Sequence, residues 1–284
     1  MLKNIALKNI ITFPHHLGQR LKGVDKGAIQ YSNHLQDINS HQKFNTIDVH
    51  CGKDFFNNIN NLYNANKKIS NQEFRLNIGG DHSMALATVA YTLNQIPHAK
   101  VVWMDAHADI NTYKKSQSKN YHGMPLSFLT GLDKAQEFPF IKQTLPFDRL
   151  FYVGLRSIDT FEQEVLNKHN IQYFISEEVN KDPEYCNAKL NKFLDDTPFH
   201  FSFDVDCFDP EIIPHTGTAV KQGVEKEQGV AVIHNLLRKK TLFNMDLTEI
   251  NPEVNRENLD NSELDASINK MFSFIDHTLK PIIQ

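Results

Sequence analysis

Short apolar, β-branched and aromatic runs alternate along this chain with longer amphipathic segments, and this alternation constrains the fold more than any other feature. Seven runs have the length of a single strand: residues 44–49, 74–78, 100–104, 149–153, 171–175, 200–205 and 242–247. Segments with apolar residues at helical spacing lie between several of them: residues 83–94, 160–168, 187–194 and 225–239. Strands that alternate with helices form parallel sheets flanked by helices. The sequence therefore predicts a three-layer α/β fold, which we expect to be one domain over residues 1–284.

Two further segments are predicted to be helical. The Asn-rich stretch at residues 57–71 mixes Leu62 and Tyr63 into polar sequence and is interpreted as a surface helix followed by a loop. Residues 262–279 carry apolar side chains at helical intervals, so we expect a packed helix that closes the fold.

Composition excludes several classes of partner and setting. The formal net charge is -4, whereas nucleic-acid and anionic-membrane surfaces normally carry a basic excess. We find no unbroken apolar run of about 18 residues and no secretory leader, so no membrane partner is expected. The three cysteines are far apart and odd in number, which indicates a reducing, cytoplasmic setting rather than a disulfide framework.

Polar residues cluster directly after three of the predicted strands. They occupy residues 79–83 (GGDHS), 105–109 (DAHAD) and 204–206 (DVD). Ligands of open α/β sheets bind just outside the carboxyl ends of the strands. We therefore expect these clusters to converge in one crevice.

Each cluster taken alone has a simpler interpretation. Asp105, His107 and Asp109 alternate, so they would lie on one side of an extended segment, but a solvated loop could carry them too. Asp204 and Asp206 could belong to a polar turn, and a lone His82 is more often a helix-start or core histidine than a ligand.

Together, the clusters offer four carboxylates and two imidazoles to one crevice. Four clustered carboxylates would raise one another's pKa unless cations lay among them, and two divalent ions would balance their charge. Hard oxygen ligands with some imidazole and no thiolate suit Mn²⁺ and tolerate Co²⁺, Fe²⁺ or Zn²⁺. We predict a binuclear centre with its metals roughly 3.5 to 4 Å apart and a bridging hydroxide as nucleophile.

These motifs resemble the three signatures of the ureohydrolases, the family that contains arginases, agmatinases and formimidoylglutamases. The resemblance runs from about residue 72 to residue 256, with the motifs in the family's order. It implies a single α/β domain and two metal ions. The implied ligands of one ion are His82, Asp105, Asp109 and Asp204, and those of the other are His107, Asp105, Asp204 and Asp206.

Segments outside the metal motifs look most like those of arginases. By resemblance, Asn111 and Ser118 would hydrogen-bond the α-carboxylate of L-arginine, while Asp159 and Glu162 would receive its α-amino group. Simpler interpretations remain, because Asp159 could be a helix N-cap and Ser118 a loop residue.

The resemblance also implies roles at the reacting end of the substrate. Thr218 and Glu249 would position the guanidinium, His122 would shuttle protons to the leaving amine, and Asp109 would orient the hydroxide. Glu249 could instead be a surface carboxylate. Two departures stand out: Gln222 replaces one of two consecutive glycines, and Cys207 occupies a position that is commonly glycine.

The sequence thus favours an arginase-type hydrolase that cleaves L-arginine to L-ornithine and urea, acting on a small guanidino substrate. The alternatives are an agmatinase, a formimidoylglutamase, or a catalytically silent metal-binding homologue. The resemblance further suggests a homo-oligomer, either a trimer or a hexamer.

Overall fold

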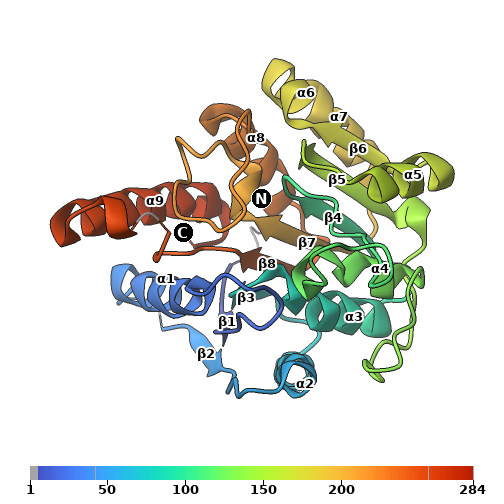
Figure 1. Cartoon of the computed structure of the whole chain (residues 1–284), viewed down its shortest axis with the longest axis horizontal. Helices are drawn as coiled ribbons and strands as arrows, with labels where there is room; N and C mark the ends of the chain where they lie inside the picture. The colour runs from blue at the N-terminus through green and yellow to red at the C-terminus, as the bar shows by residue number, and fades with distance from the viewer. Residues whose placement is uncertain (1–5, 42, 255, 284) are drawn as a thin grey trace.

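The computed structural model describes residues 6–41, 43–254 and 256–283. At its centre lies an eight-stranded sheet whose paired strands are all parallel, in the order β2-β1-β3-β8-β7-β4-β5-β6 (Figure 1). The strands are β1 (Asn9–Phe13), β2 (Asn45–Asp48), β3 (Arg75–Gly79), β4 (Lys100–Met104), β5 (Leu150–Leu155), β6 (Gln172–Ile175), β7 (Phe199–Asp204) and β8 (Leu242–Thr248).

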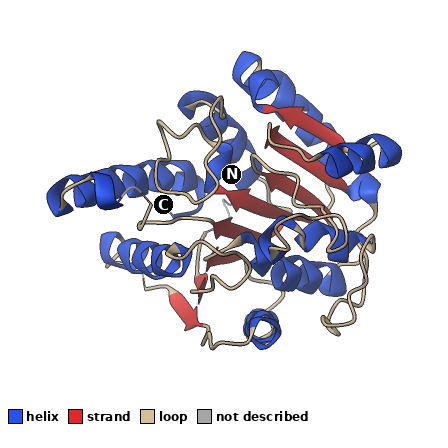
Figure 2. Ribbon diagram, viewed as in Figure 1, coloured by secondary structure: helices blue, strands red, loops and turns tan. Residues whose placement is uncertain are grey.

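Helices cover both faces of this sheet (Figure 2). Side chains of β4 alternate between the two resulting cores: Val102 and Met104 pack in one, Val101 and Trp103 in the other. The first core includes residues of α1 (Val24–Ile38), α6 (Ser176–Lys181), α7 (Pro183–Leu194), α8 (Lys226–Leu237) and α9 (Asn261–Ile283). The second includes residues of α2 (Phe55–Asn66), α3 (Ala85–Gln95), α4 (Pro125–Thr130) and α5 (Thr160–His169). None of the described helices is long and apolar enough to cross a membrane.

The predicted parallel α/β architecture is confirmed, and each of the seven predicted strands is present to within two residues at either end. Strand β1 and the helices α1, α4 and α6 were not predicted. The helix expected at the protein surface is α2, and that description was incomplete, because Ile59, Leu62 and Ala65 are buried against the sheet. Its many asparagines concealed this apolar stripe, and two of them, Asn58 and Asn66, are themselves buried.

Strand β7 carries apolar side chains on one face and polar ones on the other. Phe201 and Phe203 pack in the first core, whereas His200, Ser202 and Asp204 alternate with them and are also buried. Burying polar groups requires partners. The partners of Ser202 and Asp204 lie at the carboxyl end of the sheet, so this polar face leads to the site described next.

Candidate metal centre

The predicted ligands come together at the carboxyl edge of the sheet. His82 begins a short 3₁₀ helix, η1 (His82–Met84), after β3, and Asp105 directly follows β4. Asp204 is the last residue of β7, and Asp206 lies in the adjoining 3₁₀ helix η4 (Val205–Cys207). Since all these strands are parallel, their ends meet at one edge, and the expected crevice forms there.

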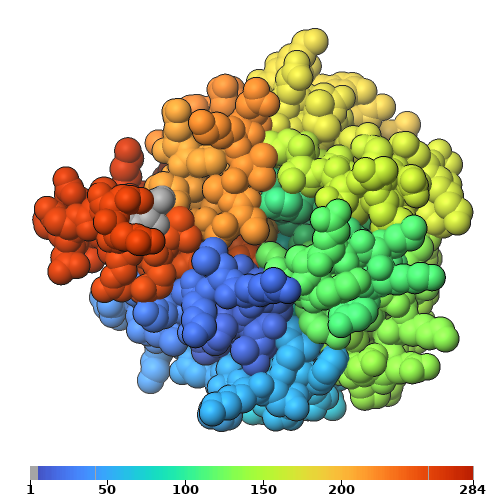
Figure 3. Space-filling view, in the orientation of Figure 1, coloured from blue at the N-terminus to red at the C-terminus, as the bar shows by residue number. Residues whose placement is uncertain are grey.

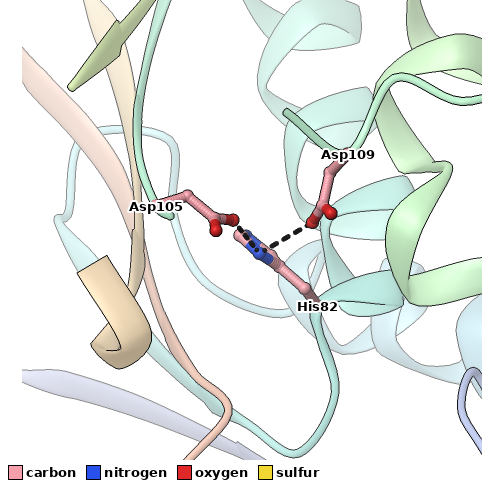
Figure 4. Close-up of side chains that lie close together, drawn as sticks. All are labelled: His82, Asp105 and Asp109. Atoms are coloured by element: carbon pink, nitrogen blue, oxygen red, sulfur yellow. Dashed lines mark ion pairs between the residues drawn. The ribbon is translucent and has the colours of Figure 1, made fainter. Parts of the chain in front are cut away.

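One group of side chains surrounds the ring of His82. Its Nδ1 lies 3.0 Å from Asp105 Oδ2, 3.2 Å from Asp109 Oδ2 and 3.2 Å from Asp204 Oδ2. Figure 4 shows the first two of these carboxylates converging on the imidazole. Nδ1 is buried and makes no well-directed hydrogen bond to the described residues, while Nε2 is 2.8 Å from Ser202 Oγ. A ring nitrogen held in this way among three carboxylate oxygens fits a cation-binding site.

A second group surrounds His107. Its Nδ1 lies 3.1 Å from Asp206 Oδ2 and 3.4 Å from Asp105 Oδ1. Asp105 therefore faces both histidines, with one oxygen toward each. The two groups, His82 with Asp105 and Asp109, and Asp105 with His107 and Asp206, could each hold a metal ion. This residue set fits two neighbouring divalent cations that share Asp105.

The electrostatics of the site support this fit. Burial and the nearby Asp206 and Asp105 raise the pKa of Asp204 well above its usual range, and burial with Asp105 raises the pKa of Asp109 to about 6. Burial by itself would lower the pKa of His82, but the surrounding carboxylates hold it well above its ordinary value. Protons thus compensate the crowded negative charge, and divalent cations would supply the same compensation.

The expected extended conformation of residues 105–109 holds at His107, which forms a parallel bridge with Ser157, and is wrong at Asp109. Asp109 has a φ of 48°, in the left-handed region, so the chain turns there and does not continue as a strand. Its carbonyl oxygen accepts a hydrogen bond from Leu126 N at 3.0 Å, which fixes the turn. The side chains still converge, because the turn brings Asp109 back toward His82.

His122 and Glu249 form a pair beside the His82 group. His122 Nδ1 lies 3.2 Å from Glu249 Oε1, which also accepts a hydrogen bond from His82 N at 2.9 Å. Burial would lower the pKa of His122, but the hydrogen bond and charge of Glu249 raise it to about 9. Glu249 is 1% exposed, so it is not a surface carboxylate.

The N-terminal loop contributes residues that the sequence did not indicate. Gln19 Nε2 donates to Glu249 Oε2 at 2.7 Å, and Gly18 O accepts from His122 N at 3.1 Å. Gly18 N also donates to Asp81 Oδ2 at 2.9 Å. No motif surrounds these two positions in the sequence, so only the folded chain identifies them.

A cavity of about 130 Å³ lies beside the candidate metal ligands. In Figure 3 a hollow is visible near the centre of the molecule, where blue N-terminal, green and orange segments meet. The cavity is lined by His107, Asp109, Asn111, Ser116, Ser118, His122, Gly123, Ser157, Asp159, Glu162, Asp204 and Thr218. Every residue expected to contact the substrate is among them except Glu249, which lies behind His122.

Asn111 and Asp159 form a hydrogen-bonded pair in the wall of this cavity. Asn111 Nδ2 donates to Asp159 Oδ2 at 2.8 Å, while the buried Asn111 Oδ1 has no hydrogen-bond partner among the described residues. Asp159 is also the N-cap residue of α5. It therefore caps the helix, as the simpler interpretation held, and lines the cavity as well. Asn111, a residue of the cavity wall, thus carries an acceptor that no described residue uses.

Glu162 and Thr218 complete the wall. The two oxygens of Glu162 accept hydrogen bonds from Ile110 N and Asp159 N, at 3.2 and 2.9 Å. Burial raises the pKa of Glu162 to about 7. Thr218 Oγ1 donates to Asp206 Oδ2 at 2.9 Å, which links the cavity wall to the second group of candidate ligands.

The two departures noted in the sequence do not line the cavity. Gln222 is exposed and has a φ of 63°, so it adopts the left-handed conformation that glycine accommodates best. Cys207 is fully buried in the first hydrophobic core. Neither side chain reaches the space in which a substrate would lie.

Comparison with known proteins gives consistent matches. The model of the family described as the Arginase family matches residues 10–272. An arginase of Entamoeba histolytica is 33% identical over 87% of this chain and 91% of its own length. An arginase of Glaciozyma antarctica is 39% identical over 65% of this chain, which spans only 56% of that relative. The crystal structure of Entamoeba histolytica arginase in complex with L-ornithine superposes with a TM-score of 0.81 and 29% identity, covering 95% of this chain and 99% of that one.

Proposed function

The chain belongs to the arginase family and is a hydrolase of the guanidino C–N bond, and on this premise we propose that it converts L-arginine into L-ornithine and urea. The observation that carries the choice of substrate is the buried, unpartnered Asn111 Oδ1 in the cavity wall. A buried acceptor without a donor is costly, so a ligand that supplies a donor there is favoured. The α-ammonium group of an amino acid supplies one, and agmatine has no such group.

The other polar groups of the cavity support an amino-acid tail. Asp159 can share the charge of an α-ammonium group, and the Ser118 hydroxyl can donate to an α-carboxylate. A contact from Asn111 to that carboxylate would require its amide to turn away from Asp159. The complex of the Entamoeba histolytica relative with L-ornithine, the product of the proposed reaction, is consistent with this assignment.

We assign the metal ligands as the geometry and the family resemblance suggest. One ion would be held by His82, Asp105, Asp109 and Asp204, and the other by His107, Asp105, Asp204 and Asp206. When bound, two divalent cations lower the pKa of a water molecule and orient it for hydrolysis. Mn²⁺ suits this ligand set best, with Co²⁺, Fe²⁺ or Zn²⁺ as substitutes.

His122 handles the proton in this proposal. Its Nδ1 is held against Glu249, and none of the described residues hydrogen-bonds to Nε2, so Nε2 is the atom that can give a proton to the leaving amine. Gln19 and His82 N fix the carboxylate of Glu249, which keeps the imidazole oriented. Direct contacts of Glu249 and Thr218 with the guanidinium remain predictions, as does the orienting role of Asp109.

The first test compares three substrates. Protein incubated with Mn²⁺, or with a chelator as control, is given L-arginine, agmatine or N-formimidoylglutamate, and urea or glutamate release is measured. We expect chelator-sensitive urea release with kcat/KM at least about tenfold higher for arginine than for agmatine, because the ammonium contact is worth more than about 1.4 kcal/mol. Preference for agmatine or the formimidoyl compound would reassign the enzyme within the family. Arginine binding without turnover would indicate a silent homologue.

Further expectations accompany this proposal. We propose a homo-oligomer, a trimer or hexamer, whose mass light scattering would measure. We also propose a cytoplasmic setting, consistent with the three cysteines being free. Cell fractionation tests this location, because some similar proteins carry the name mitochondrial arginase-2.

A further inference from the structure

We infer that Arg156 is a positioning residue that holds the ligands of the second metal ion, the one assigned to His107 and Asp206; this inference rests on the proposed metal centre. Arg156 directly follows β5, outside the cavity, and within the described part of the chain its guanidinium hydrogen-bonds only to main-chain carbonyls. The distances are 3.2 and 2.9 Å to Val220 O, 3.3 Å to Gly154 O, 2.6 Å to Asp206 O, 3.0 Å to Cys207 O and 3.2 Å to Phe208 O.

All of these carbonyls except that of Gly154, which lies in β5, belong to the segments that fix the carboxylate of Asp206. Asp206, Cys207 and Phe208 lie in or directly after η4, and Val220 is two residues beyond Thr218, which donates to Asp206 Oδ2. Arg156 thus connects the main chain of Asp206 to the segment that contains Thr218, whose hydroxyl donates to the Asp206 side chain. Moving either segment would displace the Asp206 carboxylate.

The main chain of Arg156 connects the same residues to the segment after β4. Arg156 N donates to Ala106 O at 3.0 Å, and Ala106 N donates to Asp206 Oδ1 at 3.2 Å. Ala106 lies between Asp105 and His107 in the sequence. Arg156, Ala106 and Asp206 therefore form a closed set of contacts around the His107 group.

Few side chains could replace arginine here. Three consecutive carbonyls at the C-terminal end of a 3₁₀ helix present partial negative charges that a cation stabilises. The guanidinium is planar and offers five N–H donors in a fixed arrangement, whereas a lysine ammonium offers three donors on one atom. A lysine at this position would keep the positive charge but could donate hydrogen bonds to only some of these carbonyls.

The hydrogen bonds of the Arg156 side chain lie on the side of the second metal ion, next to Asp206. Among the described residues, the Arg156 side chain forms no hydrogen bond to His82 or Asp109. The His82 ring is fixed by Ser202 and by stacking on Trp103 at 4.1 Å. Losing Arg156 should therefore weaken the second ion and spare the first.

The test measures Mn²⁺ binding to the full chain by calorimetry and metal analysis, together with the electron paramagnetic resonance of a coupled Mn²⁺ pair. The variants are Arg156→Met, which removes charge and donors, and Arg156→Lys. Arg149→Met is the matched control, because Arg149 lies at the opposite end of β5 and donates to Pro97 O. We expect wild type and control to bind two ions per chain. Arg156→Met should bind the first ion unchanged and the second about 10- to 100-fold more weakly, as expected for lost support of a metal ligand.

The other measurements distinguish a positioning role of Arg156 at the second ion from a purely structural role. Arg156→Lys should fall between wild type and Arg156→Met, and excess Mn²⁺ should restore the coupled-pair signal and kcat. Equal weakening of both ions together with a lower Tm would indicate a purely structural role and overturn the inference, as would unchanged binding. If Arg156→Met does not fold, unchanged second-ion affinity in Arg156→Lys overturns it. Fewer than two ions in wild type would overturn the metal centre itself, and the inference with it.

Discussion

The candidate site has two walls of different construction. The inner wall consists of the predicted ligands His82, Asp105, Asp109, Asp204 and Asp206, at or close after strand ends; these residues are at most 7% exposed, and Asp109 and Asp204 also line the cavity. The outer wall consists of Asn111, Ser116, Ser118 and Asp159, on the segment after Asp109 and at the start of α5. One wall is continuous with the buried sheet, and the other is carried by segments at the surface.

The walls also differ in how firmly their side chains are held. Asp105 accepts hydrogen bonds from His107 N at 2.7 Å and Trp103 Nε1 at 2.9 Å, and Asp204 accepts one from Asp206 N at 2.9 Å. Ser118, in contrast, is an exposed residue, and among the described residues its hydroxyl hydrogen-bonds only locally, with Asn120 N at 3.2 Å and Ser116 Oγ at 3.4 Å. This contrast supports the proposal that the inner wall is preorganised for chemistry and that the outer wall selects the substrate tail.

The largest effect, on metal content and turnover together, should follow a change at the centre of the inner wall. Asp105→Asn keeps the shape of a side chain that faces both histidines and removes its charge. We expect Mn²⁺ content to fall below two ions per chain and urea release to drop more than about 100-fold, since loss of a metal ligand should exceed the 10- to 100-fold effects of residues that only support ligands. Metal analysis and a urea assay check this. Asp148→Asn, an exposed carboxylate, is the control, and retention of two ions by Asp105→Asn would refute the shared ligand.

His122 lies where the two walls meet and should separate metal binding from chemistry. His122→Asn removes the proposed proton donor but none of the assigned ligands, so kcat should fall roughly 10²- to 10⁴-fold at unchanged Mn²⁺ content. KM for arginine should change much less than kcat. Initial rates over a range of arginine concentrations give both constants. A large rise in KM at constant kcat would move His122 from proton transfer to substrate binding.

A change in the outer wall should affect affinity and selectivity instead. Asn111→Ala removes the unpartnered acceptor, so KM for arginine should rise about tenfold, the effect of losing roughly 1.5 kcal/mol of hydrogen bonding to a charged group. The kcat and the weak turnover of agmatine should change little. Asn64→Ala, on the exposed side of α2, is the control. Equal losses for arginine and agmatine would contradict the assigned role of the outer wall.

The inner wall was the more predictable of the two from the sequence. Asp105 and Asp204 adjoin apolar runs whose strand character is evident, and parallel strands must end at a common edge, so the convergence of these residues followed from local patterns. The left-handed turn at Asp109 did not follow, because aspartate also adopts extended conformations and only the contact with Leu126 fixes the turn.

Local sequence patterns could not predict contacts between segments that are far apart in the sequence. Gln19 meets Glu249 across 230 positions of sequence, and nothing near Gln19 signals that contact. The unused acceptor of Asn111 likewise depends on Asp159, which is 48 residues away. Strand β1, in contrast, was missed although it is as long as β3 and β4 and its sequence NIITF itself contains a run of apolar and β-branched residues.

The smallest predicted effect concerns backbone strain outside both walls. Asp109 and Glu249 have positive φ values of 48° and 67°, and their side chains belong to the site, so their strain serves a purpose. Gln222 has a φ of 63° but an exposed side chain away from the cavity. Gln222→Gly should relieve about 1 kcal/mol of strain in the left-handed backbone conformation. Part of this stabilisation should be lost, because glycine also increases the conformational entropy of the unfolded chain.

We therefore expect Gln222→Gly to raise the free energy of unfolding by less than about 1 kcal/mol and Tm by roughly 1 to 3 °C, with kcat and KM within about twofold of wild type. Calorimetry and the urea assay measure these quantities. Asn170→Gly is the control, because Asn170 has a φ of 50° but asparagine tolerates this region, so its gain should be smaller. A destabilised Gln222→Gly variant would mean that the Gln222 side chain stabilises the segment near Val220. The strained conformation at Gln222 would then serve a purpose, like those proposed at Asp109 and Glu249.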